Sequence, residues 1–209
     1  MLEVTRIGSC IDWAACGRPL PGEGMSGDVA ISVAGADQTV LAVIDGLGHG
    51  PEAAAAAECA RDVIAVHPEE PPAVLLQLCH AALAHTRGVT MTVASIDCDA
   101  HEIHWVGVGN VRAKLVRRFE GPGVRLVSRA LLYSGTVGYS MPDVRVSSVG
   151  VLPDDLVVMA TDGIGAHFFA DVAIGQPVDR IAASILERHG KSSDDALVAV
   201  ARVAVPSWS

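Results

Sequence analysis

The chain has 209 residues, half of them hydrophobic, and a formal net charge of −9. This length predicts one domain over residues 1–209 with one sizeable core, and the scattered basic residues exclude the electrostatic footprint of a nucleic-acid partner. No signal-peptide pattern or membrane-length apolar run is present, so we expect a soluble, cytoplasmic protein without a membrane partner. The five cysteines form no CxxC pair, which favours buried or spare thiols over disulfides and zinc ligands.

The first elements predict two carboxylates on one rim. We expect a strand over 2–8, an irregular loop over 10–27 with two Pro and four Gly, and strands over 29–33 and 39–44. In an antiparallel hairpin the start of one strand lies beside the end of the other, so Asp28 and Asp45 should meet. A capping or turn role for Asp28 is equally compatible with the sequence.

The remaining elements come in blocks of helices and blocks of strands. Patterns predict helices over 51–66 and 73–86, antiparallel neighbouring strands over 89–97, 102–109, 111–118 and 124–132, a loop over 133–142, a hairpin of strands over 144–149 and 156–161, a helical turn over 164–169, a helix over 179–189 and a strand over 196–203. Helices segregated from runs of strands predict an α+β layered fold, with helices packed outside an antiparallel core.

Three of the predicted strand edges carry aspartates. Asp45 and Asp162 each end a strand and precede a glycine, and Asp194-Asp195 leads into the last strand. Carboxylates without accompanying Cys or paired His select Mg²⁺ or Mn²⁺. Gly46 has no side chain, so its carbonyl can approach an ion closely. Two such ions would outweigh three carboxylates, favour a phosphate ligand and activate water, so no nucleophilic residue is required.

Four motifs occur in an order that resembles the metal-dependent serine/threonine protein phosphatases, specifically their compact SpoIIE-like branch. The motifs are Ser26-Gly27-Asp28, Asp45-Gly46-Leu47-Gly48-His49-Gly50, Ala160-Thr161-Asp162-Gly163 and Asp194-Asp195-Ala196. The resemblance spans nearly the whole chain and implies an α-β-β-α sandwich of two antiparallel sheets flanked by helices, with the metals in a cleft at one edge. It also implies hydrolysis of phosphoserine or phosphothreonine on signalling proteins, with scaffold proteins of the stressosome, a bacterial stress-response assembly, as substrates.

The same resemblance assigns roles to residues. Asp45 would bridge two Mn²⁺ or Mg²⁺ ions, the Gly46 carbonyl would complete one of them, and Asp162 and Asp194 would hold the other. Asp28 would act through water on a metal, so Asp28 and Asp45 form the catalytic pair. Asp194, rather than Asp195, aligns with the family's ligand.

Several positions carry other expectations. Asn110 stands where many members of the family have an acidic residue associated with a third ion, so we expect no tightly held third ion. Arg6 is a candidate for the phosphate-gripping arginine of some larger members, although a surface charge is the simpler interpretation. His49 is expected to cap the following helix or fill space rather than act as a general acid, and Phe168-Phe169 to pack in the core.

Two alternative functions stay open at this stage. A catalytically silent relative could bind a phosphoprotein without turnover, but the presence of Asp45, Asp162 and Asp194 together speaks against it. A hydrolase of small phosphate esters fits the same metal chemistry, and the sequence does not discriminate it from a protein phosphatase.

Overall fold

The computed structural model describes residues 2–3, 10–97, 99–119 and 123–204. In chain order its elements are β1 (Leu2–Glu3), β2 (Ile11–Arg18), β3 (Asp28–Ala34), β4 (Thr39–Gly46), α1 (Pro51–Val66), α2 (Pro72–Ala82), β5 (Val89–Asp97), β6 (Glu102–Val108), β7 (Arg112–Arg118), β8 (Val124–Arg129), β9 (Leu132–Tyr133), β10 (Ser147–Gly150), β11 (Leu156–Ala160), the 3₁₀ helix η1 (Phe168–Asp171), α3 (Val178–His189) and β12 (Ala196–Val203).

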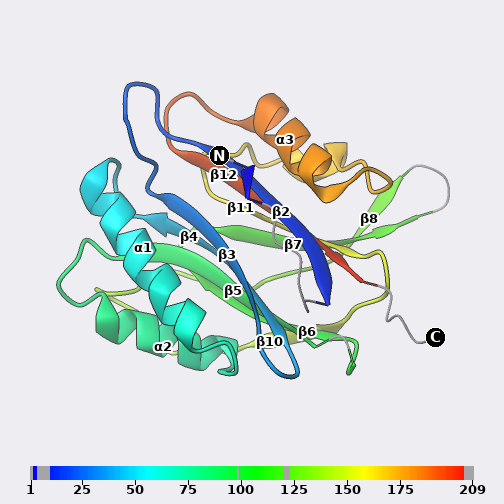
Figure 1. The fold of residues 1–209 in the computed structure, drawn as a ribbon, viewed down its shortest axis with the longest axis horizontal. Coiled ribbons are helices and arrows are strands. Elements are labelled where there is room, and N and C mark those ends of the chain that lie inside the picture. Colours follow the sequence, from blue (N-terminus) through cyan, green and yellow to red (C-terminus); the bar gives the residue numbers. More distant parts are fainter. Residues whose placement is uncertain (1, 4–9, 98, 120–122, 205–209) are drawn as a thin grey trace.

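The strands form two sheets, with helices on their outer faces (Figure 1). The first sheet has the order β1-β2-β12-β11-β7-β8, and the second has the order β10-β6-β5-β4-β3, with β9 beside β6. Helix α1 packs on β3 and β4, α2 packs beside it on β5 and β6, and α3 covers β2 and β12. The predicted α+β layered sandwich is therefore confirmed.

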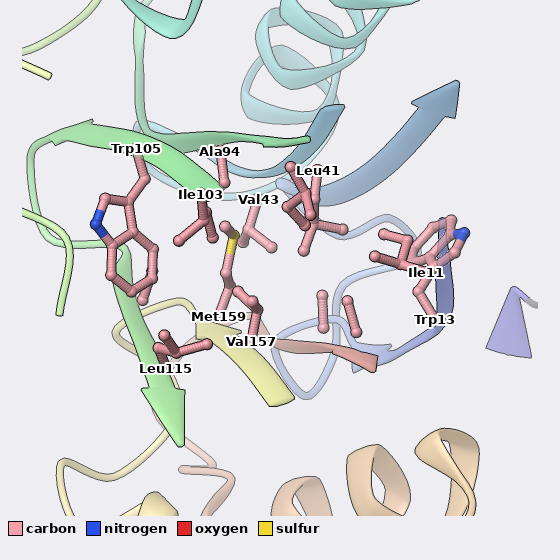
Figure 2. Packing of buried hydrophobic residues seen from close by; sticks show 14 of the residues in the cluster. Ile11, Trp13, Leu41, Val43, Ala94, Ile103, Trp105, Leu115, Val157 and Met159 are labelled. Carbon is pink, nitrogen blue, oxygen red and sulfur yellow. The ribbon is translucent and has the colours of Figure 1, made fainter. Parts of the chain in front are cut away.

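The hydrophobic core lies in three layers. Between the sheets, side chains from both inner faces interdigitate, as Figure 2 shows for Trp105, Leu41, Val157 and Met159. A second layer fills the space under α1 and α2, and a third lies under α3. This packing fixes the strand ends rigidly, which is what a site built at one edge of the sandwich requires.

The side-chain pattern of each helix determines which of its faces packs against a sheet. Five buried alanines give α1 a small inner face that lets it approach the sheet closely: Ala53, Ala54, Ala56, Ala57 and Ala60. In α3 the buried residues Val178, Ile181, Ala182 and Ile185 recur at the spacing of one helical face. None of the helices in the described ranges is long and apolar enough to cross a membrane.

The predicted loop over 10–27 is wrong in its first half, where β2 is a strand inside the first sheet. Ile11, Trp13 and Ala15 are buried in the layer between the sheets, and β2 pairs antiparallel with β12 along its length. The prolines and glycines lie only at 17–27, so they end this strand rather than prevent it. The predicted strand over 2–8 is described only at Leu2–Glu3, and its remainder lies outside the described residues.

Two predicted strand pairings are also wrong, because the chain changes sheets between neighbours. Strands β6 and β7 are consecutive but lie in different sheets, and so do β10 and β11. The predicted strand over 124–132 divides into β8, which pairs with β7, and β9, which lies parallel to β6 in the other sheet. Short connections therefore did not guarantee hairpins here.

The cysteines divide into two groups. Cys16, Cys59 and Cys79 are free thiols, as predicted, whereas Cys10 is disulfide-bonded, which contradicts the expectation of unpaired cysteines. Cys98 lies outside the described residues.

Candidate metal centre

Strand pairing brings Asp28 and Asp45 together at one edge of the sandwich. The register places Asp28 directly opposite Asp45, and Asp45 opposite Thr90 of β5. This is the left-hand edge in Figure 1, where β4 ends and β12 begins. The predicted hairpin geometry is confirmed.

Asp162 and Asp194 reach the same edge from the other sheet. Strands β11 and β12 pair antiparallel up to Ala160 and Val198, so the turn after β11 lies beside the loop before β12. The Lys191 amide donates a hydrogen bond to the Gly163 carbonyl at 2.8 Å, and the Lys191 ammonium donates to the Asp162 carbonyl at 2.6 Å. These bonds hold the Asp162 turn against the loop that carries Asp194.

Hydrogen bonds tie the two halves of the site across the sheets. Thr161 donates its hydroxyl to Oδ2 of Asp28 at 2.8 Å and accepts from the Leu197 amide at 3.0 Å. No role for Thr161 was predicted from the sequence. Its signal was a polar side chain at the end of an otherwise apolar strand, fully buried in the structure.

Asn110 links the Asp45 strand pair to Asp162. The Thr90 hydroxyl donates to Asn110 Oδ1 at 2.6 Å, and Asn110 Nδ2 donates to Asp162 Oδ2 at 2.8 Å. The amide therefore orients a carboxylate without adding charge of its own. The expectation of no tightly held third ion stays a prediction.

The structure separates the two neighbouring aspartates near β12. Asp195 is buried, and its two carboxylate oxygens accept hydrogen bonds from the amides of Leu20 at 2.6 Å and Gly27 at 2.7 Å. Asp194 is partly exposed, and its Oδ1 accepts a hydrogen bond from the Asp195 amide at 2.9 Å. Asp195 thus holds the loop before β3 in place, and the choice of Asp194 as the metal ligand stays a prediction.

The carboxylates raise one another's pKa values. Burial, followed by the charges of Asp162, Asp194 and Asp195, raises the pKa of Asp45 to about 7. Burial and then Asp45 raise the pKa of Asp28 well above its ordinary value, against a lowering effect of the Thr161 hydrogen bond. Burial and Asp162 also raise the pKa of Asp194. A divalent cation bound at this edge would stabilise the ionised form of these carboxylates.

The residues proposed as ligands supply only oxygen donors, which Mg²⁺ and Mn²⁺ prefer. Among the described residues, no group of three or more His, Cys, Asp or Glu side chains is arranged to hold a metal ion. Mg²⁺ normally keeps several waters and binds through one or two carboxylates, so a closed protein cage is not required. The assignment of Asp45, Asp162 and Asp194 as ligands stays a prediction.

Gly46 is required by packing as well as by the predicted chemistry. A Cβ added at this position would lie 2.1 Å from the Ala53 carbonyl oxygen of α1. The Gly46 amide donates to the Gly27 carbonyl at 3.0 Å, which ties the end of β4 to the residue before Asp28. Its role as a carbonyl ligand stays a prediction.

The predictions for His49, Phe168-Phe169 and Arg6 have different outcomes in the structure. His49 is mostly exposed and its Nδ1 lies 2.7 Å from Glu23 Oε1, while Gly50 is the helix cap, so the expected capping or space-filling role is wrong. Phe168 is fully buried, as predicted, whereas Phe169 is partly buried beneath the Lys114 ammonium. Arg6 lies outside the described residues.

A groove of about 590 Å³ adjoins the site behind Asp28. Its lining includes Met25, Arg18 and Arg61, but none of Asp45, Asp162 and Asp194. This groove is therefore separate from the three candidate ligands.

Comparisons with known proteins agree with this architecture. A family model described as Stage II sporulation protein E (SpoIIE) matches residues 35–204. The phosphoserine phosphatase RsbX of Bacillus subtilis (strain 168) is 28% identical over 91 residues, a segment that covers 44% of this chain and 46% of RsbX. The matched segment thus spans less than half of that relative.

Solved structures extend the likeness over almost the whole chain. One, described as "The bacterial stressosome: a modular system that has been adapted to control secondary messenger signaling", is 29% identical, covers 92% of this chain and 99% of its own, and has a TM-score of 0.80. RsbX in complex with magnesium is 21% identical, with 98% and 100% coverage and a TM-score of 0.81. The catalytic domain of the serine/threonine phosphatase PstP with two manganese ions is 17% identical, with 93% and 99% coverage and a TM-score of 0.66. The last two show the fold alone.

The two-sheet sandwich with helices on its outer faces is the fold of these phosphatase structures. The family match covers most of the chain, so the chain belongs to the SpoIIE family. The expected Mg²⁺ or Mn²⁺ agrees with the ions that the RsbX and PstP structures carry.

Proposed function

We propose that this protein is a Mg²⁺- or Mn²⁺-dependent phosphatase that removes phosphate from phosphoserine or phosphothreonine in signalling proteins, namely scaffold proteins of a stressosome. The observation that carries the proposal is the convergence of Asp28, Asp45, Asp162 and Asp194 at one rigid edge. Membership of the SpoIIE family and the likeness to RsbX support the reaction class. A cytoplasmic site of action goes with this proposal, because protein phosphorylation depends on ATP.

The proposed roles of these residues are of two kinds, namely binding the metal ions and accepting a hydrogen bond from the attacking water. Asp45, Asp162, Asp194 and the Gly46 carbonyl would hold the ions. Two bound Mg²⁺ or Mn²⁺ ions supply charge stabilisation for the phosphoryl oxygens and lower the pKa of water enough to make it a nucleophile. Asp28 lies beside Asp45, and its Oδ2 accepts a hydrogen bond from Thr161, so its Oδ1 would be left to accept a hydrogen bond from that water.

The position of the carboxylates at the edge of the sandwich supports a protein substrate over a small ester. A phosphorylated side chain on a folded surface can reach an edge of this kind, and contacts away from the phosphate can contribute binding energy that a small ester lacks. Within the described part of the chain, three basic side chains near the edge are engaged in contacts inside the protein. Lys191 is bonded to the Asp162 carbonyl, Arg112 to the carbonyls of Thr161 and Ile164, and Arg87 pairs with Glu52.

Steady-state kinetics test this proposal. With Mn²⁺ held at one concentration, kcat/KM for a phosphorylated stressosome scaffold protein should exceed that for p-nitrophenyl phosphate by about a hundredfold or more, which is roughly 3 kcal/mol in transition-state stabilisation. Comparable values, or a strong preference for a small metabolite, would instead identify a small-ester hydrolase. Binding of the phosphoprotein without turnover would identify a catalytically silent relative.

A further inference from the structure

Tyr139 is an aromatic residue that the fold holds almost entirely in solvent. Its side chain is 86% exposed, the highest fraction among the large exposed hydrophobic residues that the structure describes. An isolated exposed apolar residue needs no special explanation. Tyr139 differs from such isolated residues in two respects. Its turn is rigid, and that turn is hydrogen-bonded to the edge of the sandwich that carries Asp28, Asp45, Asp162 and Asp194, here called the metal edge.

The turn is braced by its own backbone. Thr136 and Ser140 exchange two hydrogen bonds, each of 2.9 Å, and the Tyr139 amide donates to the Thr136 carbonyl at 3.2 Å. Gly138 between them has φ of +100°, and its amide donates to His80 Nδ1 of α2 at 2.9 Å. The aromatic side chain therefore projects from a turn with little freedom to fold back.

Strand pairing connects this turn to the candidate metal ligands. Val137 is fully buried and exchanges two 2.9 Å hydrogen bonds with Val89, and Val89 is the register partner of Gly46. Gly46, Val89 and Val137 thus lie side by side, and neighbouring strands are about 5 Å apart. Tyr139 follows two residues later, which places it on the order of 10–15 Å from the end of β4.

Leu47 also lies close to Gly88. Its amide donates to the Gly88 carbonyl at 3.1 Å, and its side chain is 36% exposed. A Cβ added to Gly88 would lie 2.7 Å from Thr136 Cγ2, so the turn that carries Tyr139 is also in contact with Gly88. Leu47 and the turn that carries Tyr139 therefore both contact Gly88, next to Asp45 and Gly46.

We infer that Leu47 and Tyr139 form a docking surface for the folded phosphoprotein whose phosphate enters the metal edge. The inference rests on the proposed function. A phosphoserine side chain is short, so a folded substrate that presents it to Asp45 must bring its own surface over the adjoining rim. A rigid, exposed aromatic residue loses little conformational entropy on binding, and aromatic residues are frequent energetic centres of protein interfaces. A small phosphate ester does not extend far enough to use this contact.

The test compares two substrates in three variants. Tyr139→Ala should lower kcat/KM for a phosphorylated stressosome scaffold protein by about tenfold or more, and leave kcat/KM for p-nitrophenyl phosphate within about twofold of the parent. Tyr139→Phe, which keeps the ring, should retain activity on both substrates. Leu152→Ala is the matched control, because Leu152 is 50% exposed but precedes β11 at the opposite end from Asp162.

The outcomes separate this inference from the proposed function. If the parent hydrolyses no phosphoprotein, the proposed function fails and the docking surface fails with it. If the parent is active and Tyr139→Ala is as active as Leu152→Ala on the phosphoprotein, the docking surface alone is rejected. An equal loss on both substrates would also reject it, because that result indicates damage to the metal edge.

Discussion

Asp45 shows how the demands of a metal site oppose those of a stable fold. It lies between Asp28 and Thr90 in the sheet, faces the charges of Asp162 and Asp194, and has a pKa raised to about 7. A buried carboxylate without a compensating cation destabilises the folded state in its ionised form. The sequence placed Asp45 correctly because a strand followed by Asp-Gly is a local pattern.

The stability of the metal-free protein should therefore fall as pH rises. The pKa of Asp45 is higher in the folded state than its ordinary value of 3.8, so the folded state binds more protons between these values. Unfolding free energy should decrease from about pH 4 to pH 7, with Asp45 contributing on the order of 2 kcal/mol of that decrease after allowance for solvent screening. Thermal melts in EDTA measure this effect.

Variants identify the residue responsible. Asp45→Asn should melt higher than the parent in EDTA at pH 8 and depend less on pH, while Asp37→Asn, at the exposed turn of the same hairpin, should behave like the parent. A parent protein that is equally stable at pH 5.5 and pH 8, or more stable at pH 8, would show that ionised Asp45 does not destabilise the folded state.

The roles of other residues of the site could not be predicted from local sequence patterns. Thr161 and Asn110 act through hydrogen bonds to Asp28 and Asp162, which lie 133 and 52 residues away in the chain. Nothing in the neighbouring sequence specifies those partners, because they meet only when the two sheets pack together. The distinct roles of Asp194 and Asp195 depend in the same way on the amides of Leu20 and Gly27.

At the scale of elements, prediction succeeded where a pattern was strong and local. The hairpin of β3 and β4, helix α1 and strand β12 have alternating, alanine-rich or continuous apolar sequences, and all three were placed correctly. It failed for β2, because the loop indicated by the glycines and prolines that follow this strand was predicted to include the strand as well. It also failed to predict that β7 and β11 leave the sheet of the strands before them, since sheet choice depends on packing between the layers rather than on turn length.

Close backbone contacts join the site loops to their neighbours, and glycine makes them possible. A Cβ at Gly163 would lie 1.8 Å from the Asp195 carbonyl oxygen, so Gly163→Ala must displace the Asp162 turn from the loop that carries Asp194. We expect a loss of about 2 kcal/mol or more in unfolding free energy from urea denaturation, together with weaker Mn²⁺ binding by calorimetry.

Gly24→Ala is the matched control for this substitution. A Cβ at Gly24 meets nothing within 4 Å, so this variant should keep the stability and the Mn²⁺ affinity of the parent. If Gly163→Ala were as stable as Gly24→Ala, the close approach of the two loops would not be important for the fold.

At the scale of the whole molecule, the sandwich brings both sheets to one acidic edge. Strand ends from the second sheet contribute Asp28 and Asp45, and turns of the first sheet contribute Asp162 and Asp194. The helices cover the outer faces of the two sheets (Figure 1). The carboxylates of the site therefore come from strand ends and turns that are far apart in the sequence.

Metal removal and replacement test the central claim most directly. After treatment with EDTA, the protein should release no phosphate from a phosphorylated stressosome scaffold protein, and Mn²⁺ or Mg²⁺ should restore the reaction, because every proposed ligand is an oxygen atom. Asp45→Asn should stay at least about a hundredfold slower than the parent after Mn²⁺ is restored, and Asp28→Asn should lose less. Full activity of the parent in metal-free buffer, or equal activity of Asp45→Asn and the parent with Mn²⁺, would contradict the account.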